Sequence, residues 1–439
     1  MSTTFKSYKG QNILCVLVFL SILLLLIVAK PEDWFGVVLI PIILLFIFTQ
    51  KVFLEDTNTL IAVLFVLSCK IIISLINNNY ITLFGGEADA IGFVRRATFI
   101  SENDININLL STGSDLYENY LALVFNLTGV SKFSGEILSI FTFVISMSFL
   151  LKIARNLYGS RYNTYLVCLF SLLPSMMLYT SFTMREPYQI LFFLMSIYYF
   201  ILSLNKAKHN FNFIIKFLFS VIMMGILHNG LLAFAFIMTA IVINRIMKVK
   251  FNINNLMFRI VLVGFMLMFF VTILNLVGLS TPATDALLSG NAANYIEGYR
   301  DGGTSLDSRA LYGVELDTSN LITVILTAPL VFINYMLAPF PWQISSLIDI
   351  YAILDNLFRL TLIFLSIKYV RKTNESKKDI LSQILLLFFA MEILWSLGTV
   401  NWGTAIRHHL IAYGLILILG IPQLLDILRI KILDNQPRF

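Results

Sequence analysis

The sequence predicts an all-α polytopic membrane protein. Of its 439 residues, 58% are hydrophobic and only 13% are charged, and the mean hydropathy is +0.84. A soluble domain has about a quarter of its residues charged. Apolar stretches recur along the whole chain, each about long enough to cross the ~30 Å of hydrocarbon in a bilayer as a helix. We therefore expect a single integral membrane domain, 1–439, with no separate soluble part.

About twelve of these stretches are expected to span the membrane, with both chain termini on the cytoplasmic side. Lys6 and Lys9 precede the first stretch, and taking them as cytoplasmic places most of the 31 Lys and Arg residues on the inner side. This distribution satisfies the positive-inside rule. The expected spans are 13–29, 35–50, 58–76, 135–152, 163–182, 187–204, 212–227, 230–246, 256–277, 347–369, 380–399 and 408–428.

Two further apolar stretches do not fit as ordinary crossings. Tyr120–Val130 is too short, and Leu321–Ala338 would reverse the basic ends of every later span if it crossed. We expect both to be re-entrant or interfacial helices on the outer side, where such backbone is tolerated only if protein buries it or it lines a cavity. The alternative is an arrangement of thirteen or fourteen spans. The long outer loops lie near 77–118 and 278–319, and the second continues to 349 through the apolar segment.

Outer loops in the first half of the chain hold paired charges. Asp89 and Arg95 follow a Gly pair in the first long loop, where a carboxylate beside guanidinium groups can position a polar ligand. Arg185 and Glu186 form a tight outer turn. A Glu in the first helical turn suits the helix dipole, whereas an Arg there does not. A functional role competes with the reading that these charges are solvated and pair locally.

Two outer turns in the second half of the chain contain histidines. His228 lies in the sequence LHNG, and a His whose protonation can change near neutral pH can act as a general base. Arg407, His408 and His409 begin the last span. Basic groups oppose the dipole at a helix start, so a bound anion would explain them. Interfacial anchoring is the alternative for both turns.

The longest outer loop and two tryptophans complete the candidate site. Arg300 and Arg309 flank the sequence GGTSLDS, and the planar Arg side chain is well suited to hold phosphate. A solvated charged loop is the competing interpretation. Trp342 and Trp402 lie in outer segments, where aromatic rings can stack on sugars.

A few ionisable groups fall inside the expected spans. Asp355 and Arg359 are spaced i,i+4 and can neutralise each other on one helix face, which favours a structural role. Glu392 has no local partner, and a carboxylate within the membrane is a functional candidate by default. Walker, HExxH, nucleophile-elbow, EF-hand and GxGxxG motifs are absent from the sequence, and we expect neither a metal nor another cofactor.

Three short motifs, in chain order, resemble those of one family. The segment PS…LYTS…REPYQILF is similar to the pattern PS, aromatic-Ser-Ser, Lys-Asp; PFPW is similar to RPFPWE; and NWGTAIRHH is similar to NxGTxxRxR. These patterns are found in bacterial Wzy-type polysaccharide polymerases and related GT-C-like membrane glycosyltransferases. The chain departs from them at Arg185-Glu186, Ala338, Gln343 and His409, where the family commonly has Lys-Asp, Arg, Glu and Arg.

The resemblance implies an enzyme of the bacterial inner membrane that joins oligosaccharide repeat units carried on undecaprenyl pyrophosphate, at its periplasmic face. The product would be O-antigen or a related surface polysaccharide. The implied partners are these lipid-linked oligosaccharides and the lipid bilayer, a chain-length-regulating membrane protein is compatible with it, and nucleic acid is not expected.

This reaction needs a proton acceptor for the acceptor hydroxyl and cations for the leaving pyrophosphate. The expected catalytic residues are Asp89, Glu186, His228 and His408; the expected pyrophosphate ligands are Arg95, Arg185, Arg300, Arg309 and Arg407; the expected sugar-stacking residues are Trp342 and Trp402. A flippase or another transporter of lipid-linked oligosaccharides is the alternative function. A flippase would place its charges along a central path through many spans, whereas here they gather at one face beside a long loop.

Overall fold

The computed structural model of the chain is all-helical. It describes residues 30–86, 88–103, 105–204, 211–249, 255–276, 282–304, 310–319 and 321–430. Within these ranges the extended backbone forms one isolated bridge, between Leu311 and Asn401, and no strand. The all-α class expected from the sequence is confirmed. The first expected span, 13–29, lies outside the described residues.

Seven of the described helices are long and apolar enough to cross a membrane, which fits a membrane protein. These segments are Pro31–Thr49, Thr57–Asn79, Lys132–Tyr158, Gly230–Met247, Ile348–Lys372, Lys377–Gly398 and Trp402–Ile427.

Contacts between residues divide the chain into two compact units. Unit 1 comprises Met1–Ile107 and Glu118–Pro187, and unit 2 comprises Asn108–Tyr117 and Tyr188–Phe439. That the whole chain acts as one membrane domain stays a prediction.

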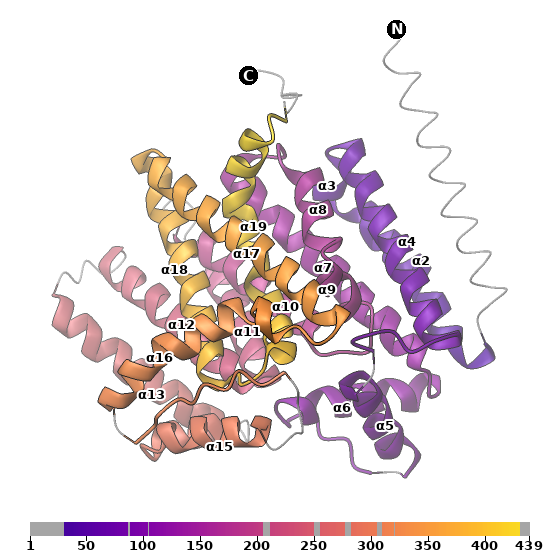
Figure 1. The fold of residues 1–439 in the computed structure, drawn as a ribbon, viewed down its shortest axis with the longest axis horizontal. Coiled ribbons are helices and arrows are strands. Elements are labelled where there is room, and N and C mark those ends of the chain that lie inside the picture. The colour runs from indigo at the N-terminus through magenta and orange to yellow at the C-terminus, as the bar shows by residue number, and fades with distance from the viewer. Residues whose placement is uncertain are drawn as a thin grey trace, which may run out of the picture. The chain divides into compact units, whose positions relative to one another are not determined.

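Unit 1 is built around α7. Its elements, drawn from indigo to magenta in Figure 1, are η1 (Pro31–Asp33), α2 (Trp34–Thr49), α3 (Lys51–Leu54), α4 (Thr57–Asn79), α5 (Ala88–Glu102), most of α6 (Ser114–Thr128), α7 (Lys132–Tyr158), α8 (Asn163–Ser171) and α9 (Pro174–Tyr179). Helix α7 packs against α2 and α4. Ser131 caps its start by accepting a hydrogen bond from Ser134 N, and Gly159, with φ 72°, follows its last residue. A glycine adopts this left-handed conformation without steric penalty.

The expected span 163–182 is interrupted in the structure. Helix α8 ends at Ser171 and α9 begins at Pro174, so two short helices replace one long one. Leu173 has φ −56° and ψ 123°, outside the helical region. The cause is local, because the ring of a proline disfavours helical backbone in the preceding residue and its nitrogen has no proton to donate.

Unit 2 contains the remaining helices. They are α10 (Glu186–Leu204), whose first residues belong to unit 1, α11 (Phe211–Leu227), α12 (Asn229–Val249), α13 (Leu256–Leu276), α14 (Pro282–Leu288), α15 (Ala292–Thr304), α16 (Leu321–Leu337), η3 (Pro341–Gln343), α17 (Leu347–Lys372), α18 (Glu375–Gly398) and α19 (Trp402–Ile427). Except for α14, α15, α16 and η3, these helices coincide with expected spans, although α18 and α19 begin five and six residues earlier than expected.

Helix α19 forms the centre of unit 2. It packs against α17 and α18, and the three helices lie side by side in Figure 1. Gly420 lets α19 approach α17 closely, because a Cβ atom added there would lie 3.0 Å from the Leu362 carbonyl oxygen. The Ser366 hydroxyl group lies within hydrogen-bonding distance of the carbonyl oxygens of Leu362 and Ile416, at 2.7 and 3.0 Å. Small residues at such crossings are typical of helices packed within a membrane.

Helix α16 ends inside unit 2. Its last carbonyl groups, at residues 335–338, accept hydrogen bonds of 2.7 to 3.3 Å from the side chains of His409, Arg359 and Asn356. These carbonyls have no partner within a helix, so the three side chains satisfy them. Arg359 lies twelve residues beyond the start of α17, about 18 Å along the helix axis. The chain then runs back to Ser346, the N-cap of α17.

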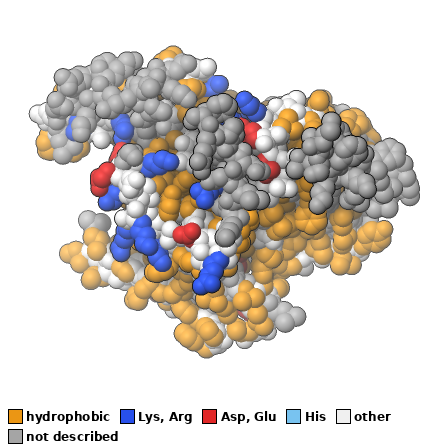
Figure 2. All heavy atoms as spheres, turned by 90° about the horizontal axis from the view of Figure 1, so that it is seen from above, with side chains coloured by type: hydrophobic (Ala, Val, Ile, Leu, Met, Phe, Trp, Pro, Cys, Tyr) orange, Lys and Arg blue, Asp and Glu red, His pale blue; other side chains and the backbone are white. Residues whose placement is uncertain are grey.

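The end of unit 2 at which α17 ends and α18 begins is basic. Arg371 and Lys372 occupy the last turn of α17, and both are exposed. Arg245 of α12 forms a 3.3 Å ion pair with Asp379 near the start of α18. In the view of Figure 2, Lys and Arg side chains and a few Asp and Glu side chains are visible, with hydrophobic side chains over much of the remaining described surface.

Candidate functional site

Two histidines and a tryptophan meet at one end of unit 2. His228 joins α11 to α12, Trp395 lies in the last turns of α18, and His408 lies in the second turn of α19. The rings of Trp395 and His408 are stacked, with centroids 3.8 Å apart and planes inclined by 18°. The His228 ring lies 4.6 Å from Trp395 and 5.8 Å from His408, edge-on to both. The two histidines that the sequence singled out therefore belong to one cluster.

Hydrogen bonds give the two histidines opposite tautomers. The backbone N–H of Gly230 donates to Nδ1 of His228 at 3.1 Å, so a neutral His228 carries its proton on Nε2. The hydroxyl of Thr399 donates to the Trp395 carbonyl oxygen at 2.7 Å, and it must then accept from Nδ1 of His408 at 2.8 Å. Neutral His408 therefore presents Nε2 as an acceptor, which is the form that a general base requires.

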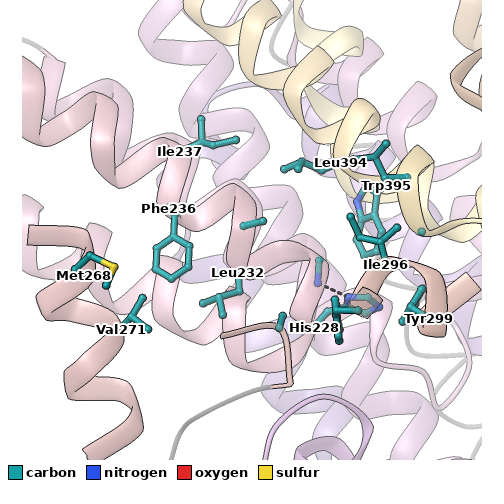
Figure 3. A pocket seen from close by; sticks show the side chains of 16 residues that line it. His228, Leu232, Phe236, Ile237, Met268, Val271, Ile296, Tyr299, Leu394 and Trp395 are labelled. Atoms are coloured by element: carbon teal, nitrogen blue, oxygen red, sulfur yellow. Dashed lines mark hydrogen bonds between the residues drawn. The ribbon is translucent and has the colours of Figure 1, made fainter. Parts of the chain in front are cut away.

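An apolar cavity of about 470 Å³ adjoins this cluster. Its walls come from α12, α13, α14, α15 and α18, and apolar side chains make up nearly all of its lining. Figure 3 shows His228 and Tyr299 on one side of the cavity, with Met268 and Val271 on the other. A cavity within the ~300–1,000 Å³ range of ligand pockets, with few polar groups, suits an apolar ligand whose polar end lies near His228.

Arg300 holds the long loop against α18. Its side chain is 7% exposed, and its two terminal nitrogens donate to the carbonyl oxygens of Leu397 at 3.2 Å and Val314 at 3.0 Å. Burial lowers the pKa of Arg300 from its ordinary value. A cation is favourable beside the last carbonyls of a helix such as α18. These contacts give Arg300 a structural role, and its expected contact with pyrophosphate stays a prediction.

Trp402 is bound to the start of α17. It is 4% exposed, and its indole N–H donates to Oδ1 of Asp349 at 3.2 Å. Asp349 Oδ2 accepts from the backbone nitrogens of Ser345 and Ser346 at 3.0 and 2.9 Å, so this carboxylate also fixes the first turn of α17. The buried ring of Trp402 is engaged by protein in this structure. Its expected role in stacking on a sugar stays a prediction.

The other sequence-derived residues of unit 2 differ in their surroundings. Trp342 is 79% exposed and its ring stacks on Phe340 at 4.8 Å, so one face is available to a ligand or to lipid. Arg407 is half-buried on α19, directly before His408. Arg309 lies outside the described residues.

His409 pairs with Glu392, the carboxylate for which the sequence offered no local partner. His409 Nδ1 lies 2.5 Å from Glu392 Oε2, and its Nε2 donates to the Tyr335 carbonyl oxygen at 3.1 Å. Both His409 and His408 thus have hydrogen-bond partners within the protein. The expectation that Arg407, His408 and His409 begin the last helix is wrong, because α19 begins at Trp402. A bound anion is therefore not needed to account for the two adjacent histidines.

Unit 1 contains the remaining candidates. Asp89 and Arg95 are exposed on α5, and Asp89 lies in the first turn, where a carboxylate suits the helix dipole. The Arg185 guanidinium lies 6.0 Å from the ring centroid of Phe93, which is also on α5. Glu186 is 6% exposed and begins α10. The Arg185-Glu186 turn is therefore next to the helix that carries the other two charges, and the catalytic or binding roles of all four residues stay predictions.

Several residues in and around the candidate site were missed by sequence reasoning. Trp395, Thr399 and Asp349 had no distinguishing signal, because a tryptophan near a span end is typical of interfacial anchoring, and Thr and Asp are common at helix ends. The only signal that could have singled out Asn356 is that it is an amide side chain within an expected apolar span. The residues that these side chains contact are distant in the sequence, or are brought next to them only by the packing of the helices.

Among the described residues, no group of three or more His, Cys, Asp or Glu side chains is arranged to hold a metal ion. No protein-family model matches the chain, and neither the curated proteins nor the solved structures include a significant match.

Proposed function

We propose that the protein is a membrane glycosyltransferase of the polysaccharide-polymerase class. It joins oligosaccharide units carried on undecaprenyl pyrophosphate at the periplasmic face of the bacterial inner membrane, forming O-antigen or a related surface polysaccharide. The observation that carries this proposal is that His228 and Trp395 line an apolar cavity and that His408 stacks on Trp395. A lipid-linked sugar needs such a junction, with hydrocarbon on one side and reactive polar groups on the other.

The chemistry follows from the tautomers of the cluster. His408 accepts the proton of the acceptor hydroxyl at Nε2 while the new bond forms between that oxygen and the anomeric carbon of the donor. The bond from the anomeric carbon to the phosphate oxygen breaks, and the lipid pyrophosphate leaves as an anion. Arg407, next to His408 on α19, supplies positive charge toward this anion. His228 donates a hydrogen bond from Nε2 to a sugar or phosphate oxygen.

The proposed topology has about twelve spans, with a re-entrant α16. The contacts of His409, Arg359 and Asn356 with the end of α16 support this arrangement, because a helix that ends at membrane depth needs its last carbonyls satisfied by protein. The exposed Arg371 and Lys372 then lie on the cytoplasmic side, and the histidine cluster lies on the periplasmic side.

Deletion of the gene tests the function against its main alternative. Loss of a polymerase leaves single, unpolymerised repeat units that still reach the outer face of the membrane and the surface acceptor. Loss of a flippase instead causes lipid-linked units to accumulate on the cytoplasmic face. Lipid-linked and surface glycans are extracted from the deletion strain and from the complemented strain and compared by gel and mass spectrometry. Accumulation on the cytoplasmic face would overturn the polymerase proposal.

A further inference from the structure

Arg359 is a buried cation with unused hydrogen-bond donors. Its side chain is 2% exposed, and Nη2 donates to the Met336 carbonyl oxygen at 2.7 Å and to Asn356 Oδ1 at 3.0 Å. Nε and Nη1 are buried and have no hydrogen-bond partner in the part of the chain that the structure describes. Capping α16 thus occupies only one of the three guanidinium nitrogens. A buried donor without an acceptor is strongly disfavoured, and a charged one more so.

Tyr312 supplies a further buried donor. It is 5% exposed, and its hydroxyl has no hydrogen-bond partner within the described residues. The ring lies within electrostatic range of both Arg359 and Arg300, and burial raises the pKa of Tyr312, so the phenol stays protonated. The backbone fixes its position, because Tyr312 N donates to the Val400 carbonyl oxygen at 3.0 Å, directly before α19.

The nearby carboxylate does not satisfy these donors. Glu392 Oε2 is engaged by His409 Nδ1 at 2.5 Å, and Glu392 interacts with Arg359 only at longer range. Glu392 Oε1 is also buried without a hydrogen-bond partner within the described residues, as are Nε and Nη1 of Arg359 and the hydroxyl of Tyr312. The last three atoms can donate a proton. The group that would satisfy them must therefore be an acceptor, and the fixed charge of Arg359 favours an anion.

We propose that Arg359 and Tyr312 bind one oxyanion group of the phosphate class. Guanidinium and phenol groups make strong, charge-assisted hydrogen bonds to phosphate oxygens. The site itself is inferred from the buried donors of Arg359 and Tyr312 that have no hydrogen-bond partner among the described residues and from the electrostatic interaction between the two residues. That its natural occupant is the pyrophosphate of a lipid-linked glycan rests on the proposed function.

Binding measurements on the full-length protein in lipid nanodiscs test this site. Inorganic pyrophosphate and farnesyl pyrophosphate are titrated separately by isothermal titration calorimetry. Tyr312→Phe removes only the hydroxyl, and Arg359→Lys keeps the charge but not the planar set of donors. Each variant is expected to weaken binding about tenfold or more, the usual effect of losing a hydrogen bond to a charged group. Tyr117→Phe, which alters a buried tyrosine on α6, is the matched control and should keep the wild-type affinity. Thermal unfolding establishes that each variant is folded.

The two ligands distinguish the source of the phosphate. Equal affinities show that the site recognises the oxyanion alone, and tighter binding of farnesyl pyrophosphate shows that the hydrocarbon contributes. Failure of the wild type to bind either ligand, or unchanged affinity in folded Tyr312→Phe protein, shows that the site holds only water and overturns the inference. If the wild-type protein binds pyrophosphate but the deletion strain still polymerises its glycans, the binding site is supported and the proposed function is overturned.

Discussion

The imidazole of His408 stacks on the indole of Trp395, with ring centroids 3.8 Å apart, and so joins the start of α19 to the end of α18. The hydroxyl of Thr399 lies between the two helices and bonds both residues, donating to the Trp395 carbonyl and accepting from His408 Nδ1. The ring face fixes where the imidazole lies, and the hydroxyl fixes which nitrogen carries its proton. Such positioning is what a general base needs before substrate arrives.

Replacing His408 or its orienting hydroxyl should therefore reduce polymerisation to different extents. His408→Gln removes the base and should slow the reaction about 10²- to 10⁴-fold. Thr399→Val keeps the shape but removes the acceptor of His408 Nδ1, and should slow the reaction about tenfold. Rates are measured with purified protein and lipid-linked units. Thr361→Val, which alters an exposed threonine on α17, is the control. A wild-type rate in His408→Gln would exclude His408 as the base.

Asp349 should contribute to stability by fixing the start of α17. Its carboxylate accepts from Ser345, Ser346 and Trp402, so Asp349→Ala removes a helix cap together with a buried partner. We expect a loss of about 0.5–2 kcal/mol for the cap alone, seen as a lower midpoint of thermal unfolding. Asp379→Ala, at the exposed ion pair with Arg245, is the control and should change little. An unchanged midpoint in Asp349→Ala would show that the cap is dispensable.

Much of the helical framework could be predicted because long apolar windows leave few alternatives. Helices α4, α17, α18 and α19 match expected spans, since each window is bounded by polar or charged residues. The division of 163–182 into α8 and α9 shows the limit, because hydropathy does not register that Pro174 interrupts an apolar stretch. The inward end of α16 is also beyond sequence reasoning, since its carbonyls are satisfied by side chains from α17 and α19.

The candidate site was predictable in its histidines but not in its connections. His228 and His408 were singled out as polar groups in otherwise apolar surroundings, and the structure places them in one cluster. Arg300 and Trp402 were assigned to ligands because no local partner was visible. Their partners lie in other helices or loops, at Leu397 and Asp349, and only the packing of unit 2 reveals them.

A side chain at Gly420 should separate α19 from α17. The added Cβ of Gly420→Ala would lie 3.0 Å from the Leu362 carbonyl oxygen, which is backbone and cannot move aside readily. Such overpacking costs about 1–3 kcal/mol, and Gly420→Leu should cost more. Thermal unfolding in detergent measures the difference. Gly264→Ala on α13, where a Cβ would meet no atom within 4 Å, is the matched control. Equal stability of Gly420→Leu and wild type would contradict the close crossing.

Removing Arg300 should expose the loop that it ties to α18. Arg300→Ala removes hydrogen bonds to the carbonyls of Leu397 and Val314. Residues 310–317 are then held by the backbone bonds of Ala310 and Tyr312 near the start of α19 and by the bonds of Asp317 to α16. Each charge-assisted bond contributes about 1.5–3 kcal/mol, so local opening should become at least about tenfold more frequent. Limited proteolysis with chymotrypsin, which cleaves after Tyr312, measures the opening. Arg245→Ala is the control at the basic end, and equal cleavage in both variants would show that Arg300 does not hold the loop.

Reporter fusions should place the two ends of unit 2 on opposite sides of the membrane. Arg300 of α15 bonds Leu397, and Trp402 begins α19 only a few residues later, so fusions near Gly302 and Trp402 must report the same side. Asn374 joins α17 to α18 at the other end. Because the basic residues gather around Asn374, the positive-inside rule predicts a cytoplasmic signal there and a periplasmic signal at Gly302 and Trp402. Paired alkaline phosphatase and green fluorescent protein fusions read both outcomes. A cytoplasmic signal at Gly302 would place the histidine cluster on the wrong side for a periplasmic polymerase, and different signals at Gly302 and Trp402 would contradict the packing of α15 against α18.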